Sequence, residues 1–296
     1  MADHNDDHRE VDEVSGVQTT GHEWDEIKEL DNPMPRWWLY TFYATVIWGV
    51  AYTVAMPSWP LISEAFGGVM GYSSRTEVTE AIAGHKAAQS VYTDRIAEMG
   101  VDDIAADDEL MQFAQAGGAA IFRTWCAQCH GAGAAGGIGY PNLNDDDWLW
   151  GGTRQAIYDT IAHGVRWDED PDTRFSEMPA FGVDGLLEKE QVAEVVEYVY
   201  GLTHDDADPA LADAGAVVFA DNCVSCHGED AGGMQDLGAP SLTDRIWLYG
   251  GDREALTQTV TYSRRGVMPS WVQRLGEADV KQVALYVHSL GGGETE

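Results

Sequence analysis

The sequence predicts an all-α protein with one N-terminal transmembrane helix followed by two tandem copies of one small helical domain. Two observations lead to this fold class: an uncharged run at residues 37–56, and a repeat in the second half that aligns on two cysteine–histidine motifs. Apolar residues also recur at helical spacing within each copy. At 296 residues the chain is long enough for two or three domains.

The uncharged run reads WWLYTFYATVIWGVAYTVAM. As a helix it would measure roughly 30 Å, the thickness of a bilayer's hydrocarbon core. The alternative is a cleaved signal peptide, but an acidic tail precedes the run instead of a short basic segment. Lys28 and Arg36 lie before the run and no Lys or Arg follows until Arg75. The positive-inside rule therefore places the N-terminus in the cytoplasm and the rest of the chain outside.

The repeat is clearest where residues 141–152 (PNLNDDDWLWGG) align with residues 240–251 (PSLTDRIWLYGG). In each copy we expect a helix that runs into the motif, a glycine-rich loop, a second helix, a Met-Pro loop and a closing helix. The second helix is predicted to begin at the capping residue Thr153 or Asp252 and to reach Gly164 or Gly266. The closing helices are predicted at Glu190 to Leu202 and at Glu277 to Leu290.

These features predict five parts. Within the third part, residues 76–99 have a helix-forming composition, and the acidic stretch 102–109 is interpreted as a linker. The five parts are a cytoplasmic acidic tail (1–35), the transmembrane helix (36–57), an extracytoplasmic spacer helix and linker (58–108), a first domain (109–203) and a second domain (204–296).

The only four cysteines form two motifs, Cys126-Ala-Gln-Cys129-His130 and Cys223-Val-Ser-Cys226-His227. Two thiols at this spacing on a helical turn can add to the two vinyl groups of haem, while the next residue's imidazole lies over the iron. A zinc site made of two cysteine pairs would leave both histidines without a role. We therefore predict two covalently bound haem c groups, with His130 and His227 as the proximal ligands, in two cytochrome c domains.

The sixth ligand of each iron is predicted from matching Met-Pro positions. Met178 is the only methionine between the first motif and the second domain, and Met268 repeats both its spacing and its following proline. A lone methionine usually fills a gap in a core, but a pair repeated in this context favours ligation. We expect Met178 to ligate the first iron, with His130, and Met268 to ligate the second, with His227.

Two other residues are candidates for the sixth ligand of an iron. His163 could reach the first iron, but its repeat partner is Tyr262, which is no ligand of this type. Met234 lies only seven residues beyond His227, which is too close to reach the opposite face of a haem without strain.

Iron with His and Met ligands has a relatively high reduction potential and no open coordination position. The pair of domains is therefore expected to carry electrons and not to transform a substrate. Haem propionates need donors, and the candidates are Trp148, Arg166, Trp247 and Arg265, although ordinary core tryptophans and surface arginines would look the same.

The formal net charge is −33 at pH 7, which excludes nucleic acid as a partner because phosphate would be repelled. Two explanations of this charge stay open. The acidic surface either steers a cationic redox partner or reflects adaptation to high salt.

The segment at residues 31–38, DNPMPRWW, the single span and the order of the two haem domains resemble the dihaem subunit III of cbb3-type cytochrome c oxidases. The resemblance covers nearly the whole chain. It implies a single-pass protein of the bacterial inner membrane whose haem domains are periplasmic. It also implies a non-catalytic subunit of an oxidase, one that accepts electrons from a periplasmic donor cytochrome and hands them to a monohaem subunit, which feeds the haem-copper catalytic subunit.

Two other functions remain open from the sequence. An independent, membrane-tethered dihaem carrier would need the same domains but no surface for an oxidase. A haem-based sensor or peroxidase would need an open iron position, which the two Met-Pro loops disfavour.

Overall fold

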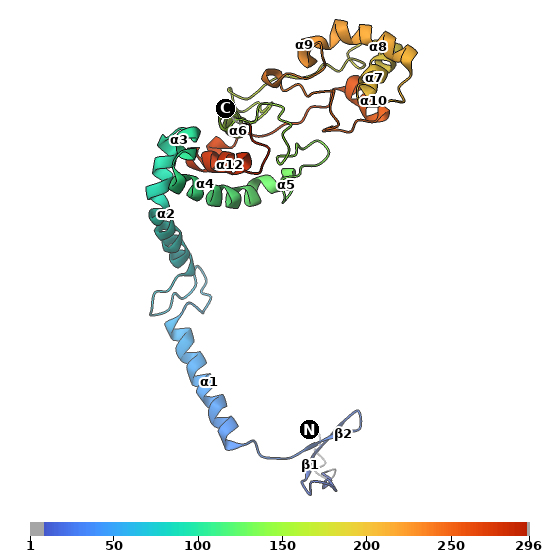
Figure 1. Ribbon diagram of the computed structural model, residues 1–296. Coiled ribbons are helices and arrows are strands. Elements are labelled where there is room, and N and C mark those ends of the chain that lie inside the picture. Colours follow the sequence, from blue (N-terminus) through green and yellow to red (C-terminus); the bar gives the residue numbers. More distant parts are fainter. Residues whose placement is uncertain (1–8, 295–296) are drawn as a thin grey trace. The chain divides into compact units, whose positions relative to one another are not determined.

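The computed structural model describes residues 9–294 (Figure 1), so the first eight residues of the predicted tail lie outside it. The chain divides into two compact units, Met1–His85 and Lys86–Glu296, and each is described by itself.

The first unit begins with a β-hairpin inside the segment predicted as an acidic tail. Strands β1 (Thr19–Trp24) and β2 (Ile27–Leu30) pair antiparallel. The two turn residues, Asp25 and Glu26, have φ of +47° and +69°. Positive φ at both central residues is typical of the tight turn whose twist matches that of paired strands. The prediction missed this hairpin because the turn contains neither glycine nor asparagine.

Helix α1 (Arg36–Ala55) follows and occupies the segment predicted to span a membrane. None of its residues is buried. Within residues 9–294, however, no helix combines the length and the apolar composition that crossing a bilayer requires. The helix is confirmed, and the span stays a prediction.

Helix α2 (Ser74–Glu98) matches the predicted spacer helix and crosses the boundary between the two units. The acidic stretch after it, interpreted as a linker, is instead largely helical. Helix α3 (Val101–Ala105) buries Val101 and Ile104, and Asp107 caps α4 (Asp108–Ile121) by accepting from the backbone of residues 109 and 110. The prediction was wrong here because it weighed the acidic residues and overlooked the two apolar ones between them.

The rest of the second unit is helical and follows the repeat. In the first copy the elements are a π-helical turn η1 (Phe122–Cys126), α5 (Ala127–His130), α6 (Arg154–His163) and α7 (Lys189–Gly201). In the second copy they are α8 (Pro209–Asn222), α9 (Val224–His227), the 3-10 turn η2 (Gln235–Leu237), α10 (Arg253–Tyr262), α11 (Val272–Leu275) and α12 (Glu277–His288).

The predicted helix starts are confirmed, because Thr153 and Asp252 cap α6 and α10 by accepting from the backbone N–H three residues on. Gly164 follows the end of α6 as predicted. Helix α10 stops at Tyr262, earlier than the predicted Gly266, because Ser263 adopts a left-handed conformation that ends it.

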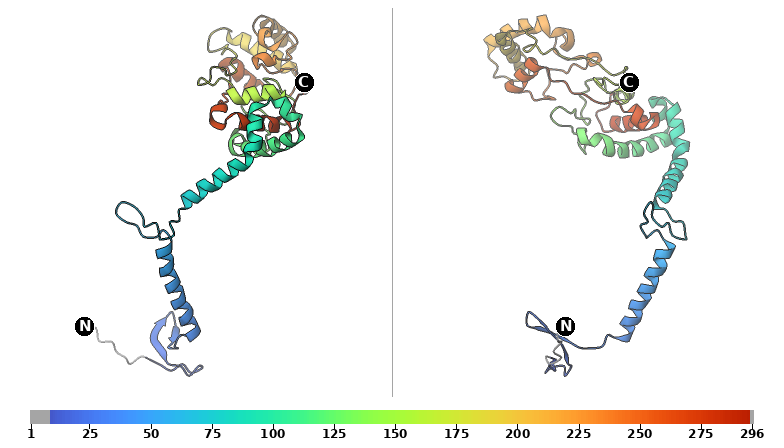
Figure 2. Two further views of the ribbon diagram at one scale, coloured as in Figure 1. Left: turned by 90° about the vertical axis from the view of Figure 1, so that its left-hand side faces the viewer. Right: turned by 180° about the vertical axis from the view of Figure 1, so that it is seen from behind.

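The closing helices do not pack on their own copies. Helix α12 packs on α4 and α6 of the first copy, and α7 packs on α8 and α10 of the second. Figure 1 and both views in Figure 2 show α12 alongside α4. Two cores are each built from both copies: one from η1, α6 and α12, the other from α7, α8 and α10. A third cluster of buried residues joins α2, α3 and α4 to α12. The predicted boundary at residues 203 and 204 therefore separates helices in sequence but does not separate the two cores.

A buried ion pair fixes α7 to the second copy. The Glu197 side chain is 7% exposed, and Arg253 donates to both of its carboxylate oxygens at 2.8 and 2.9 Å. Glu197 also accepts from the backbone N–H of Asp208, at the start of α8, at 2.7 Å. These bonds lower the pKa of Glu197, chiefly through Arg253. One carboxylate thus ties α7 to both α8 and α10.

Candidate haem sites

The first motif lies where the π-helical turn η1 runs into α5. This brings Cys126 and Cys129 onto one turn and places His130 at its end. His130 Nδ1 lies 3.0 Å from the Pro141 carbonyl, which fixes the ring and leaves Nε2 as the nitrogen available to a metal. Burial lowers the pKa of His130, against the opposing effect of this bond, so the imidazole is neutral at pH 7 and can act as a ligand.

The second motif repeats this geometry. His227 Nδ1 lies 3.0 Å from the Pro240 carbonyl, and burial again lowers the pKa of the ring. All four cysteines are free thiols, and burial raises the pKa of Cys126 and of Cys223 to about 11. Both motifs therefore present what covalent haem attachment needs, two unpaired thiols and one neutral, oriented imidazole.

A cavity of about 420 Å³ opens beside the second motif. Its wall contains the second motif's thiols and histidine together with Met178, which comes from the first copy. Five apolar side chains of the wall come from α7, α8 and α10, as expected for a haem pocket. They are Val195, Val199, Phe219, Leu256 and Val260.

Met268 lies in the other core. It packs against the same cluster of buried residues as Cys126 and Trp148, and its backbone exchanges two hydrogen bonds with Val165, of 2.9 and 3.0 Å, just after α6. The matching contact on the other side joins the Ser263 hydroxyl, just after α10, to the Met178 carbonyl. The structure thus places each methionine beside the motif of the other copy, the reverse of the pairing expected from sequence order.

Two family models and several known proteins match this chain. The family model "Cytochrome C oxidase, cbb3-type, subunit III" matches residues 113–199 and 210–287, and "N-terminal domain of cytochrome oxidase-cbb3, FixP" matches residues 16–63. The chain is 56% identical to the "Cbb3-type cytochrome c oxidase subunit FixP" of Sinorhizobium medicae, over 98% of this chain and 99% of the relative. It is 55% identical to the "Cbb3-type cytochrome c oxidase subunit CcoP" of Cereibacter sphaeroides, over 93% and 95%.

The chain belongs to the subunit III family of cbb3-type cytochrome c oxidases. The resemblance inferred from the motifs is confirmed. As a cytochrome c subunit of this oxidase, the chain works in electron transport, and oxygen reduction belongs to another subunit.

Within this subunit III, three of the four candidate propionate donors line the 420 Å³ cavity, namely Arg166, Trp247 and Arg265. Arg166 already donates to the carbonyls of Gly266 and Ser176, and Arg265 pairs with Glu177. Arg264, which the sequence did not single out, lines the same cavity. The fourth candidate, Trp148, donates its indole N–H to the Gly292 carbonyl at 2.6 Å.

The two rival ligands lie elsewhere. His163 Nδ1 is 3.3 Å from both carboxylate oxygens of the buried Asp170, which holds the ring at the end of α6. Met234 is 38% exposed, and its backbone pairs with Ala239 in the loop after the second motif. The carbonyls of Pro141 and Pro240 were missed by the prediction, although both prolines stand at matching places in the repeat.

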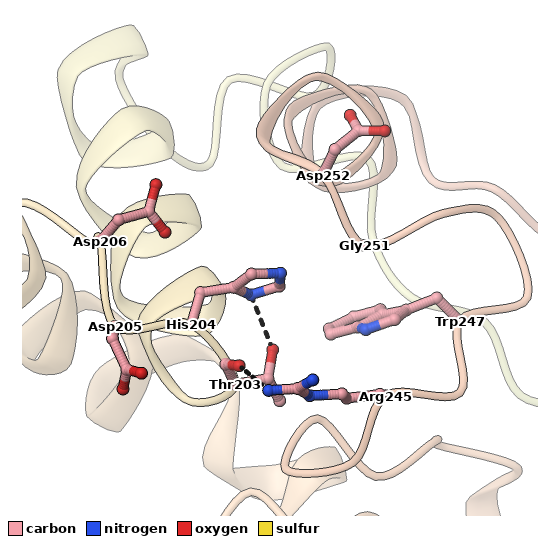
Figure 3. A pocket seen from close by; sticks show the side chains of 8 residues that line it. All are labelled: Thr203, His204, Asp205, Asp206, Arg245, Trp247, Gly251 and Asp252. Atoms are coloured by element: carbon pink, nitrogen blue, oxygen red, sulfur yellow. Dashed lines mark hydrogen bonds between the residues drawn. The ribbon is translucent and has the colours of Figure 1, made fainter.

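A second cavity, of about 610 Å³, lies beside the first and shares Trp247 with it (Figure 3). It opens between the segment after α7, with His204 pointing into it, and the start of α10. Its lining includes His204 but neither cysteine nor methionine.

Asp147 lines the 420 Å³ cavity and has a pKa raised to about 6. Burial is the main cause, and the charges of Asp244, Asp145 and Asp146 add to it. Because the folded-state pKa exceeds the ordinary value of 3.8, the ionised carboxylate destabilises the fold above about pH 6, and this cost vanishes as the pH falls below 3.8.

We expect Asp147→Asn to stabilise the protein at pH 7.5 by about 1 kcal/mol, a gain of roughly 2–4 °C in melting temperature. The gain should disappear at pH 3.5, where the wild-type carboxyl is already neutral. Thermal melts of the haem-loaded protein at both pH values test this, with Asp213→Asn, at an exposed position that does not affect the pKa of Asp147, as the control. An equal gain at both pH values would contradict the assigned cause.

Proposed function

We propose that this chain is the dihaem electron-entry subunit of a cbb3-type oxidase. It accepts electrons from a periplasmic donor cytochrome and passes them to the monohaem subunit and on to the haem-copper subunit. The observation that carries the proposal is the cavity in which Met178 faces the thiols and histidine of the second motif. With histidine on one side and methionine on the other, no coordination position is left for a substrate.

The proposed ligand sets are crossed. His227 and Met178 serve the haem attached to Cys223 and Cys226, while His130 and Met268 serve the haem attached to Cys126 and Cys129. The support is the core packing, which groups Met178 with Cys223 and Met268 with Cys126. The guanidinium groups at residues 166, 264 and 265 suit the carboxylates of haem propionates in an otherwise acidic chain.

When bound, haem supplies a one-electron iron couple. The chain's own residues do the rest. The Pro141 and Pro240 carbonyls orient the two imidazoles through Nδ1. The apolar walls exclude water, and thioether ligation by the methionines favours the ferrous state and so raises the reduction potential.

The proposal includes membrane attachment through α1, with the N-terminus in the cytoplasm and the haem domains in the periplasm. Its support is an uncharged run of helical residues after Arg36 in which no side chain is buried by the rest of the protein. Aromatic rings at both ends of the run suit the headgroup layer of a bilayer.

Purification from native membranes tests the proposal. The chain should resist an alkaline wash, extract in mild detergent with b-type haem, copper and oxygen-consuming activity, and retain two haems by mass spectrometry after denaturation. Deleting it should abolish donor-driven respiration of that complex. Extraction at low and high salt is the control, because surface charge affects donor binding more than contacts within the membrane. Clean separation from b-type haem at both salt concentrations, with an oxidase that keeps its full rate, would favour an independent carrier.

A further inference from the structure

Two aromatic residues occupy equivalent places in the repeat and reach across to the opposite copy. Trp150 and Tyr249 both stand at the end of the aligned stretch, in the sequences Trp-Leu-Trp-Gly-Gly and Trp-Leu-Tyr-Gly-Gly. Neither is required to hold a thiol, an imidazole or a thioether. Both are half-buried in the interface between the two copies.

Tyr249, from the second copy, covers the loop after the first motif. A Cβ added to Gly139 would lie 3.2 Å from Tyr249 Cε1, and Gly139 has φ of +82°. The backbone N–H of Gly139 also donates to the Leu248 carbonyl at 2.8 Å. Two residues further on, the Pro141 carbonyl orients His130. Tyr249 therefore packs against the segment that holds the first proximal histidine.

The same tyrosine reaches the loop of Met268. A Cβ added to Gly266, two residues before that methionine, would lie 3.4 Å from the Tyr249 hydroxyl oxygen. Arg264, in the same loop, donates to the Tyr249 carbonyl at 2.9 Å, with its guanidinium 5.6 Å from the centre of the Tyr249 ring. One side chain thus contacts both loops that carry the axial ligands proposed for one haem.

Trp150, from the first copy, does the same for the other haem. A Cβ added to Gly238 would lie 2.2 Å from Cε2 and Cζ2 of the indole, so the ring rests directly on that backbone. Gly238 precedes Pro240, which orients His227, by two residues. The guanidinium of Arg174, four residues before Met178, lies 5.7 Å from the Trp150 ring centre.

We infer that Tyr249 and Trp150 are positioning residues, each of which holds both axial-ligand loops of the haem attached to the opposite copy. Tyr249 acts on the His130–Met268 pair and Trp150 on the His227–Met178 pair. The inference rests on the proposed crossed ligation. If each copy packed independently of the other, neither ring would contact the ligand loops of the other copy.

The test uses the haem-loaded, full-length protein. In each background only one iron keeps its methionine ligand, so the charge-transfer band reports on that iron alone. In a Met178→His background, the remaining methionine-to-iron charge-transfer band belongs to the His130 haem. There Tyr249→Leu should weaken or remove the band and Trp150→Leu should leave it. In a Met268→His background the remaining band belongs to the His227 haem. There Trp150→Leu should weaken the band more than Tyr249→Leu does, although the Tyr249 side chain lines the cavity of that haem. Haem content measured on each sample separates a positioning effect from failure to attach haem.

Gentler variants keep the test usable if a leucine variant does not fold. Tyr249→Phe retains the ring edge at Gly139 and should leave the band in place, whereas Gly139→Ala inserts a methyl group against that edge and should weaken it. Trp150→Phe, smaller than the indole, should weaken only the His227 band. If each ring acts on the haem of its own copy, or if neither acts, the inference is wrong. If the parent protein carries no covalent haem, or if neither Met→His background loses any of its charge-transfer band, it is the proposed function that fails.

Discussion

Met178→His is expected to lower the reduction potential of the haem attached to Cys223 and Cys226 by on the order of 0.2 V. Imidazole favours the ferric state more than a thioether does, and axial ligands span a range of roughly 0.8 V. The expectation follows from the cavity that Met178 shares with the second motif. The Met178 iron should also lose its charge-transfer band while the other iron keeps its own.

A variant that attaches a single haem shows which of the two haems changes its reduction potential. With Cys126 and Cys129 both replaced by alanine, only the haem of the second motif remains, and Met178→His should act on it fully. Met234→Leu is the control, since this methionine lies in the loop after the second motif and is not among the residues that line the cavity with Met178. If Met178→His instead leaves the single remaining haem unchanged, the ligands follow sequence order and the crossed proposal is wrong.

Much of the second unit could be predicted because its signals are local. The spacing of the cysteines and histidines, the caps at Thr153 and Asp252, and the apolar periodicity of the helices each depend on a few neighbouring residues. The two Met-Pro loops could be predicted as a pair because they stand at matching positions of the repeat.

The partner of each closing helix could not be predicted, and the repeat itself is the reason. Helices α7 and α12 present nearly the same apolar face, with Val195, Val196 and Val199 in one and Val283, Ala284 and Val287 in the other. Each face would fit either copy, so the pattern cannot tell packing within a copy from packing across copies. Contacts that do distinguish the copies, such as Glu197 with Arg253, join residues far apart in sequence.

The exchange of closing helices also bears on how the subunit could work. Each core contains a methionine loop and a helix from the other copy, so each proposed ligand loop packs against residues of both copies. Arg166 illustrates this, because it donates to carbonyls in both methionine loops, at Gly266 and Ser176. Two haems held in this way are fixed relative to each other by the fold and not by a flexible linker.

A close contact between helices α4 and α12 gives the last prediction, that Gly118→Ala destabilises the protein strongly. A Cβ at Gly118 of α4 would lie 2.2 Å from the Gln282 carbonyl oxygen and 2.7 Å from Tyr286 Cβ, both on α12. Backbone cannot move aside as a side chain can, so α12 must shift away from α4. We expect a loss of roughly 2–3 kcal/mol, about 5–10 °C in melting temperature.

The neighbouring glycine provides the control. A Cβ at Gly117 would meet the end of the buried Gln282 side chain and no backbone atom, and alanine is the better helix former, so Gly117→Ala should cost clearly less than Gly118→Ala. The repeat provides an independent check. A Cβ at Gly215 of α8 would lie 2.0 Å from the Glu194 carbonyl oxygen on α7, so Gly215→Ala should cost about as much as Gly118→Ala. Gly118 and Gly215 both meet the closing helix of the opposite copy. Exchanged closing helices therefore require similar losses of stability at both positions and a smaller loss at Gly117. Thermal melts that show Gly118→Ala and Gly117→Ala to be equally stable would exclude the packing of α12 on α4.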